Sequence, residues 1–227
     1  MNNTINLKNI TKKYYNNKNI KVLDNINFSF ELGKTYSIVG PSGSGKSTLL
    51  NILSLIDRPT SGNISFFSKN INFNKSTVND KIRSKKIGII YQEKNLLNDF
   101  TTIENVYLPK LLLTNDKNQS LIEAKKIIKK VGLGARLDHY PSELSGGECQ
   151  RIAISRAIIN SPQIILADEP TGSLDFNNAK EIFKILFDLK IKDRMIIFAT
   201  HNRYFANMAD CKLEMVDGNI KSINAKK

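Results

Sequence analysis

The stretch that decides the fold is "GPSGSGKST", residues 40–48. It fits the pattern of Gly, four residues, Gly, Lys and Ser or Thr. An apolar run, "TYSIVG" (35–40), precedes it, and "KSTLLNILSLID" (46–57), with apolar side chains at helical spacing, follows. A strand that enters such a loop and a helix that leaves it are the required context of a phosphate-binding loop. The sequence therefore predicts a site for a nucleoside triphosphate such as ATP.

The glycine loop is expected to bring backbone amides and two side chains to the phosphates. Gly43 and Gly45 lack a Cβ, so the backbone can curl and direct successive N–H groups inward. We expect Lys46 to bridge the β- and γ-phosphates and Ser47 to offer its hydroxyl to Mg²⁺. The candidate ATP-binding residues of the loop are Gly40, Pro41, Ser42, Gly43, Ser44, Gly45, Lys46, Ser47 and Thr48.

Outside the loop, short apolar runs alternate with helical patterns. The first 40 residues alternate between polar and apolar side chains, as half-buried antiparallel strands do. Further strands are predicted at 87–92, 163–169 and 195–200, helices at 147–160, 177–190 and 202–209, and a closing hairpin at 211–223 that turns at Asp217 and Gly218. Strands that alternate with helices predict an α/β fold with a mostly parallel sheet, here of the P-loop NTPase class.

One segment interrupts this alternation. From about residue 93 to residue 143 the sequence is helical and rich in lysine, and we interpret it as an inserted helical subdomain. Residues 1–92 and 144–227 then form the ATPase core, with its antiparallel β part at the N-terminus. A chain of 227 residues can bury one core and a small satellite, so we expect a single domain.

The composition constrains the partners and the compartment. The chain has 34 Lys and Arg against 21 Asp and Glu, a net charge of +13. This excess suits an anionic partner, either nucleic acid or the anionic cytoplasmic face of a membrane, but the lysines are scattered and also fit a general bias toward Lys, Ile and Asn. The two cysteines form no CxxC pattern, which favours a reducing compartment. The sequence has no signal-peptide layout and no apolar run of about 18 residues, so we expect a cytosolic protein.

Two adjacent carboxylates end the predicted strand "QIILADE" (163–169). Strand alternation directs Asp168 and Glu169 to different sides, so they cannot share a role. Asp168 fits as a direct or indirect partner of Mg²⁺, and Glu169 fits as the general base that takes a proton from the attacking water. A solvated strand end is the simpler interpretation. The carboxyl edge of an open α/β sheet is, however, where ligands bind.

A second glycine-rich turn opens a second helix at "LSGGECQ" (144–150). Ser145, Gly146 and Gly147 place amides and a helix dipole at another anion site, although Ser145 also fits as an ordinary N-cap. One nucleotide already has its phosphates held by residues 40–48. The second turn therefore suits a nucleotide held by another copy of the chain, which predicts two copies arranged head to tail with ATP between them.

At these residues the chain resembles the ATP-binding subunits of ATP-binding-cassette (ABC) transporters, over nearly its whole length. "LSGGECQ" is similar to the family's signature motif, but Cys149 stands where the family often has a longer polar residue. The resemblance implies that Tyr14 stacks on adenine, that Gln92 senses Mg²⁺ and the attacking water, and that His201 contacts the γ-phosphate. It also places "SLD" (173–175) at the dimer interface.

Each of these assignments has an alternative. Tyr15 could be the stacking residue, although Tyr14 is favoured by its place after "TKK". Gln92 could merely end its strand, and His201 could cap a helix. Taken together, the expected catalytic residues are Glu169, His201 and Gln92, and the expected metal-binding residues are Ser47, Gln92 and Asp168. Cys149, beside the second anion site, is expected to be sensitive to thiol reagents.

Two longer stretches, 49–66 and 87–113, resemble one branch of the family, which serves lipoprotein release, macrolide-type export and cell division. The segment "ENVYLP" (104–109) is the most specific part. Within this branch the resemblance favours the lipoprotein-releasing system. It implies integral membrane permease subunits as partners, docked on the helical subdomain, and a peripheral location on the cytoplasmic face of the inner membrane. A regulatory ATPase of the cell-division type and a macrolide or peptide exporter remain alternatives.

Other classes with similar motifs fit less well. DNA-repair ATPases need long coiled-coil arms, and the roughly 100 residues between Lys46 and Leu144 contain no heptads, so no nucleic acid is expected. Translation-associated relatives carry two cassettes in one chain, and this chain has one. A nucleotide kinase would lack the serine-glycine turn.

Overall fold

The computed structural model describes residues 4–16 and 18–225. The chain forms two compact units. The first contains the described residues up to Arg83 and those from Lys190 onward, and the second runs from Ser84 to Leu189.

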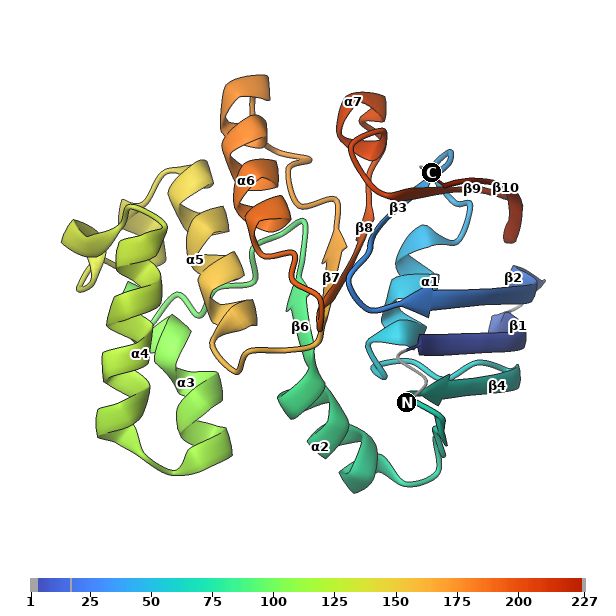
Figure 1. The fold of residues 1–227 in the computed structure, drawn as a ribbon, viewed down its shortest axis with the longest axis horizontal. Coiled ribbons are helices and arrows are strands. Elements are labelled where there is room, and N and C mark those ends of the chain that lie inside the picture. The colour runs from blue at the N-terminus through green and yellow to red at the C-terminus, as the bar shows by residue number, and fades with distance from the viewer. Residues whose placement is uncertain (1–3, 17, 226–227) are drawn as a thin grey trace. The chain divides into compact units, whose positions relative to one another are not determined.

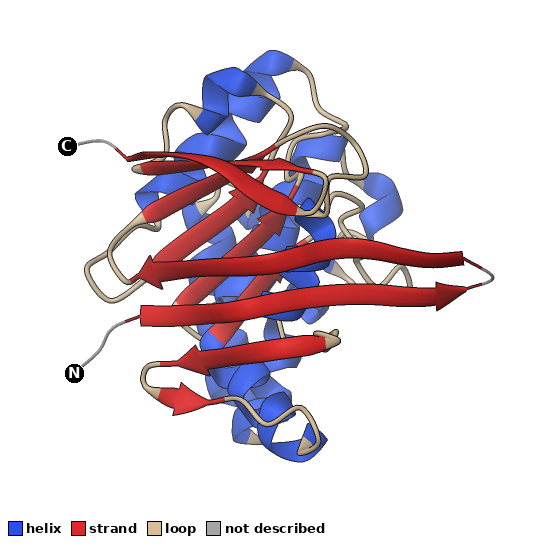
Figure 2. Ribbon diagram, turned by 90° about the vertical axis from the view of Figure 1, so that its right-hand side faces the viewer, coloured by secondary structure: helices blue, strands red, loops and turns tan. Residues whose placement is uncertain are grey.

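The first unit contains an antiparallel sheet in the order β2-β1-β4-β5. Its long strands β1 (Thr4–Asn16) and β2 (Lys18–Glu31) lie side by side (Figure 2). β4 (Ser61–Phe66) pairs with β1, and β5 (Lys69–Asn70) pairs with β4. Alternate side chains of β1, such as those of Ile5 and Leu7, are buried, as expected for strands with one covered face. The predicted antiparallel N-terminal part is confirmed.

The same unit contains four strands in the order β10-β9-β3-β8 (Figure 1). The strands β3 (Thr35–Val39), β8 (Met195–Ala199) and β9 (Cys211–Val216) are parallel, and β10 (Asn219–Ala225) is antiparallel to β9. Every residue of β8 is buried, which explains its continuous apolar sequence. The helices of this unit are α1 (Lys46–Leu53) and α7 (Arg203–Ala206), and α2 (Ser76–Lys86) begins in it.

The second unit combines two parallel strands with a helical lobe. β6 (Ile87–Ile90) pairs with β7 (Ile164–Asp168). The helices α3 (Thr102–Thr114), α4 (Lys117–Lys130) and α5 (Gly146–Ile158) pack around a core that includes Val106, Ala124, Ile128 and Ile152 (Figure 1). Two short 3-10 helices, Gly134–Arg136 and Pro141–Glu143, join α4 to α5, and α6 (Phe176–Asp188) follows β7. The segment from about 93 to 143, which we expected to be an insertion, lies wholly within this unit.

Several predicted bounds were wrong. The helix expected over 46–57 ends at Leu53, because Leu55 adopts a left-handed backbone with φ of 61°. The helix expected over 202–209 covers only Arg203–Ala206. The strands β4 and β5 and the helix α2 were not predicted from the sequence, because their side chains are mostly polar. In α2, Asn79 is the one buried residue among those that the structure describes.

Candidate functional site

The glycine loop (residues 40–48) leads into α1, and a lysine amine lies over its backbone. The Nζ of Lys46 donates hydrogen bonds to the carbonyl oxygens of Gly40 and Pro41, each at 2.9 Å. The N-cap of α1 is Gly45. Within the described chain, no side chain caps this helix and its first turn contains no acidic residue. The first amides of α1 are therefore open to an anion, and the helix dipole favours negative charge there.

Two glycines of the loop are required by close packing. Gly45 has a φ of 100°, and a Cβ at this position would lie 2.7 Å from Cδ2 of Leu23 and 2.8 Å from the carbonyl oxygen of Val22. A Cβ on Gly40 would collide with the carbonyl oxygen of Met215. The neighbouring chain therefore leaves no room for a side chain at Gly40 or Gly45, and a larger residue at either position would displace the loop.

The other loop residues differ in their exposure. Ser42 and Ser47 are exposed, Thr48 is half-buried, and Gly43 has a φ of 78°. Ser44 is buried, and its hydroxyl oxygen has no hydrogen-bond partner among the described residues. The Ser47 hydroxyl on the first turn of α1 is thus available to a ligand at the loop.

Tyr14 and Tyr15, the two candidates for stacking on adenine, have different surroundings. The hydroxyl of Tyr14 donates to Oδ2 of Asp57 at 2.8 Å. Burial and Asp57 raise the pKa of Tyr14, while a hydrogen bond with Thr48 opposes this shift. Because Thr48 closes the glycine loop, Tyr14 lies beside the loop. Tyr15 is 67% exposed, against 38% for Tyr14. These contacts support the assignment of Tyr14.

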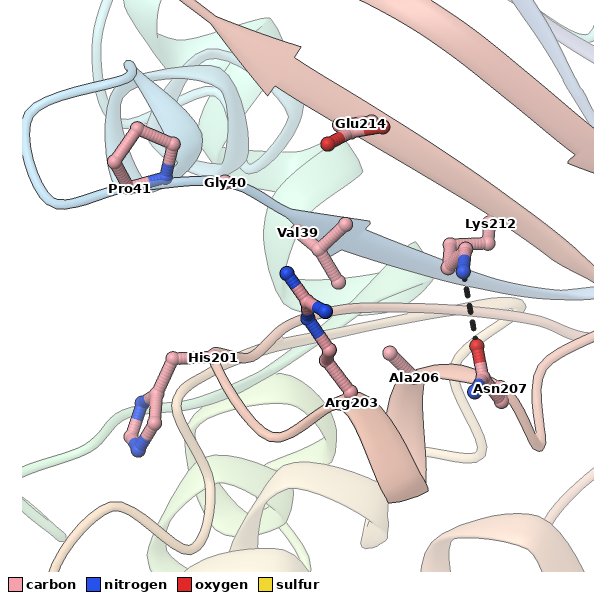
Figure 3. Close-up of a pocket in the computed structure, with 9 residues that line it drawn as sticks. All are labelled: Val39, Gly40, Pro41, His201, Arg203, Ala206, Asn207, Lys212 and Glu214. Atoms are coloured by element: carbon pink, nitrogen blue, oxygen red, sulfur yellow. Dashed lines mark hydrogen bonds between the residues drawn. The ribbon is translucent and has the colours of Figure 1, made fainter.

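His201 lies at a cavity next to the glycine loop. It is exposed and directly precedes Asn202, whose side chain accepts from Tyr204 and Phe205 and caps α7. The helix cap considered for His201 is therefore formed by its neighbour. The cavity has a volume of about 660 Å³. Figure 3 shows its lining residues, which are Val39, Gly40, Pro41, His201, Arg203, Ala206, Asn207, Lys212 and Glu214.

The acidic residues lie at the end of β7 in the second unit. Asp168 is half-buried, and its Oδ1 has no hydrogen-bond partner among the described residues. Glu169 has a left-handed backbone with φ of 44°, a conformation that costs energy and is concentrated at active sites. The Nε2 of Gln92 lies 3.1 Å from where a Cβ on Gly172 would be, and the Gly172 amide donates to the Glu169 carbonyl at 3.0 Å. The amide of Gln92 therefore lies beside the turn that follows Glu169.

The serine-glycine turn (residues 145–147) begins α5 with a capping box. The Ser145 hydroxyl accepts from the Glu148 amide at 3.3 Å, and the Glu148 carboxylate accepts from the Ser145 amide at 2.8 Å. Gly146 is exposed, whereas Gly147 is buried. The guanidinium of Arg136 lies 3.2 Å from Glu148. Ser145 and Gly146 are thus exposed in this turn, and the carboxylate of Glu148 is bonded to its backbone.

Sequence reasoning missed the contacts that hold the segment after Gln92. The guanidinium of Arg156 donates to the carbonyl oxygens of Asn95 at 2.6 Å and Lys94 at 3.0 Å. Lys94 in turn donates to the hydroxyl of Ser173 at 3.1 Å. Arg156 lies in the helical run after the second glycine turn, but its spacing alone does not indicate a partner some 60 residues earlier.

Each unit brings together its own part of the expected site. The first unit contains Tyr14, the glycine loop and His201. The second contains Gln92, Asp168, Glu169 and the serine-glycine turn. Among the described residues, no group of three or more His, Cys, Asp or Glu forms a metal-binding cluster. None of the helices in the same residues is both long enough and apolar enough to cross a membrane.

Comparison with known proteins identifies the family. The model of the ABC transporter family matches residues 23–172. The lipoprotein-releasing system ATP-binding protein LolD of Rickettsia bellii is 43% identical over 211 residues, which are 92% of this chain and 93% of that protein. The protein of the same name from Wigglesworthia glossinidia brevipalpis is 44% identical over 99% of this chain and 100% of its own length.

The fold has a close match among solved structures. One is the dimeric structure of a post-hydrolysis state of the ATP-binding cassette MJ0796, bound to ADP and Pi. It is 35% identical, with a TM-score of 0.91, over 98% of this chain and 99% of the other. The chain therefore belongs to the ABC transporter family, as an ATP-hydrolysing cassette with the α/β fold of the P-loop NTPases.

Proposed function

We propose that this chain is the ATP-hydrolysing subunit of a lipoprotein-releasing transporter, with ATP held between two head-to-tail copies. The observation that carries the ATP site is the uncapped N-terminus of α1, over which Lys46 lies. The name shared by relatives that match nearly the whole chain supports the lipoprotein assignment.

Within one copy, the glycine loop holds the triphosphate through its amides and Lys46. Tyr14 stacks on the base. Glu169 accepts the proton of the attacking water, and Gln92 orients that water. His201, on the rim of the loop cavity, contacts the γ-phosphate.

Mg²⁺ fits the residues present. Asp168 has a carboxylate oxygen without a partner in the described structure, and the Ser47 hydroxyl is exposed on the loop helix. Hydroxyl and carboxylate oxygens are the ligands that Mg²⁺ prefers, and Gln92 could supply an amide oxygen. When bound, Mg²⁺ neutralises charge on the phosphates.

The second copy completes the site with its serine-glycine turn. Ser145, Gly146 and Gly147 present a hydroxyl and amides at a helix N-terminus, which suits a phosphate. The solved relatives described as dimeric cassettes support this arrangement.

The membrane permease is proposed to dock on the helical lobe, which places the chain on the cytoplasmic face of the inner membrane as a peripheral subunit. Large apolar side chains are exposed there or just before it, as a docking surface requires. They are Leu97, Phe100, Leu112 and Ile122.

The function can be tested by purifying the chain with its membrane partner and reconstituting both in vesicles. ATP should release a lipoprotein from the membrane, and Lys46→Ala should abolish release. Hydrolysis without release would favour a regulatory ATPase of the cell-division type, and transport of a macrolide or a peptide instead would favour an exporter. Either result would overturn the lipoprotein assignment while leaving the ATPase intact.

A further inference from the structure

A carboxylate after the loop helix connects the proposed base-stacking ring to a buried lysine. Oδ2 of Asp57 accepts from the hydroxyl of Tyr14 at 2.8 Å. Oδ1 accepts from Nζ of Lys12 at 2.6 Å and from the amide of Arg58 at 2.7 Å. Both oxygens of Asp57 are therefore engaged, and one of them restrains the tyrosine.

The lysine is fixed in turn. Lys12 is only 7% exposed, and besides Asp57 it donates to the carbonyl oxygen of Arg58 at 2.8 Å. A buried ammonium needs such partners, because an unpaired charge out of water is costly. Partial burial opposes ionisation of Asp57, but hydrogen bonds from Lys12 and Tyr14 outweigh it and keep the pKa of Asp57 below its usual value. Asp57 is therefore a carboxylate at neutral pH.

The ammonium of Lys12 also lies over the ring of Tyr14, 4.7 Å from the centroid. A cation at this distance is attracted to the π-face. The ring is thus restrained in two ways, by its hydroxyl on Asp57 and by Lys12 on one face. A base that stacks on Tyr14 must use the opposite face.

The segment that carries Asp57 is anchored to β1. The amide of Thr60 donates to the carbonyl oxygen of Thr11 at 2.8 Å, and the amide of Lys13 donates to the hydroxyl of Thr60 at 2.9 Å. Asp57 follows α1, whose N-terminus is formed by the glycine loop. The stacking ring is therefore joined to the phosphate-binding helix through this carboxylate, in addition to its hydrogen bond with Thr48.

We propose that Asp57 and Lys12 are positioning residues that hold the Tyr14 ring ready for the nucleobase, and so set the preference for ATP over a triphosphate without a base. This rests on the proposed function, in which Tyr14 stacks on adenine. A surface aromatic side chain that is free to rotate loses that freedom on binding, and a restrained one has already lost it.

The test measures the affinity of the purified chain for Mg-ATP and for magnesium tripolyphosphate, which has no base, by calorimetry. Tyr14→Phe keeps the ring but removes the hydroxyl that binds Asp57. We expect it to weaken ATP binding about three- to tenfold, with tripolyphosphate binding unchanged. KM for ATP should rise while kcat stays constant. Tyr15→Phe, on the exposed neighbour, is the matched control and should change neither affinity.

Asp57→Asn should reproduce the effect of Tyr14→Phe. The double variant should be no worse than the weaker-binding single variant, because both changes break one network. Asp24→Asn is its control, since Asp24 pairs with Lys21 at 2.6 Å on the surface of the same unit. If Asp57→Asn only lowers the melting temperature and leaves the ratio of the two affinities unchanged, Asp57 has a structural role and the proposal is wrong.

Tyr14→Ala separates this proposal from the function on which it rests. If Tyr14→Ala leaves the ratio of ATP to tripolyphosphate affinity unchanged, Tyr14 does not stack on the base, and the assignment in the proposed function fails. If Tyr14→Ala lowers the ratio but Tyr14→Phe and Asp57→Asn do not, stacking stands and the positioning role of Asp57 is refuted.

Discussion

Helices α1 and α5 both begin at a glycine-rich turn, but their first turns differ in chemistry. At α1 the N-cap is Gly45, and in the described structure it offers no side-chain cap and no carboxylate. At α5 the Ser145 hydroxyl accepts from the Glu148 amide, and the Glu148 carboxylate accepts from the Ser145 amide. The backbone N–H groups at the start of α1 are therefore left without a capping side chain. Some of those at the start of α5 are already bonded within its capping box.

The difference also concerns charge. Lys46 lies over the glycine loop at the start of α1 and attracts an anion. At α5, hydrogen bonds from Ser145, together with Arg136 and against partial burial, lower the pKa of Glu148, so a negative charge stands at the second turn. We therefore expect the glycine loop at α1 to bind a triphosphate by itself. We expect the serine-glycine turn at α5 to be a weak anion site that contributes when another copy already holds the nucleotide.

The largest effect is expected from a variant that keeps ATP bound in the dimer. Glu169→Gln should slow hydrolysis by roughly 10² to 10⁴, the range for loss of a general base. ATP should then remain bound, and both turns should stay engaged in a dimer that survives gel filtration. A variant that stays monomeric at saturating ATP would contradict the role given to the second turn.

The next largest effect is expected from removing the amine of Lys46 at the glycine loop. Lys46→Ala should weaken ATP binding by about 10- to 100-fold, because charge-assisted hydrogen bonds to the phosphates are lost. Equilibrium dialysis of the monomer measures this. Lys69→Ala, on an exposed strand, controls for the general loss of a positive charge. Unchanged ATP affinity in Lys46→Ala would show that this amine does not hold the phosphates.

The second turn can be blocked without harming its helix. Gly146→Asp places a carboxylate in the first turn of α5, which stabilises the helix but repels a phosphate. Affinity of the monomer for ATP should stay the same, while ATP-driven dimerisation falls about tenfold or more. Gly146→Ala, whose Cβ would lie 3.4 Å from the nearest atom of Leu174, is the control for bulk. Weaker ATP binding by the monomer would show that the turn acts within its own chain.

A smaller effect is expected from removing the negative charge of Glu148 at the serine-glycine turn. Glu148→Gln keeps the capping box, since glutamine also fits this position, and removes the negative charge. The ATP concentration that gives half-maximal dimerisation should fall about two- to fivefold, as measured by light scattering. Arg136→Gln should shift it in the opposite direction. If both variants raise this concentration, charge does not control the second turn.

The smallest effect concerns the thiol beside the second turn. We expected Cys149 to be sensitive to thiol reagents, but the structure argues against a reactive thiol. Its sulfur lies 3.4 Å from the carbonyl oxygen of Pro141, and burial raises its pKa, so less of it is thiolate at neutral pH. Alkylation at pH 7 should be several-fold slower than in the unfolded chain and should speed up as the pH rises. Peptide mass spectrometry measures the rate of alkylation at Cys149. Equal rates in the folded and the unfolded chain would show that this thiol is not buried.

Much of the fold could be predicted because the decisive signals are local. The glycine loop lies between a buried strand and a helix, and the strands at Ile164–Asp168 and Met195–Ala199 are almost entirely apolar. Residues 61–86 were not predicted, since β4 has three exposed residues and α2 buries Asn79 as its one described core contact. Their structure depends on pairing with β1 and on surface packing, which no short pattern reveals.

Motifs in the sequence name most of the proposed site residues, but the choice between two candidates can depend on a distant contact. Strand alternation cannot choose between Tyr14 and Tyr15, since both are exposed. The choice depends on Asp57, which lies 43 positions away. The left-handed backbone of Glu169 also follows from the turn around it rather than from its residue type.

The most direct test of the shared site mixes two impaired variants. Lys46→Ala impairs the glycine loop and Gly146→Asp impairs the serine-glycine turn, so each variant alone should hydrolyse ATP at only a small fraction of the wild-type rate. In a mixed head-to-tail dimer, one of the two sites combines an intact loop with an intact serine-glycine turn. Mixing equal amounts should therefore restore hydrolysis to about a quarter of the wild-type rate. If mixing restores no activity, the two turns do not meet across a pair of copies, and the account is wrong.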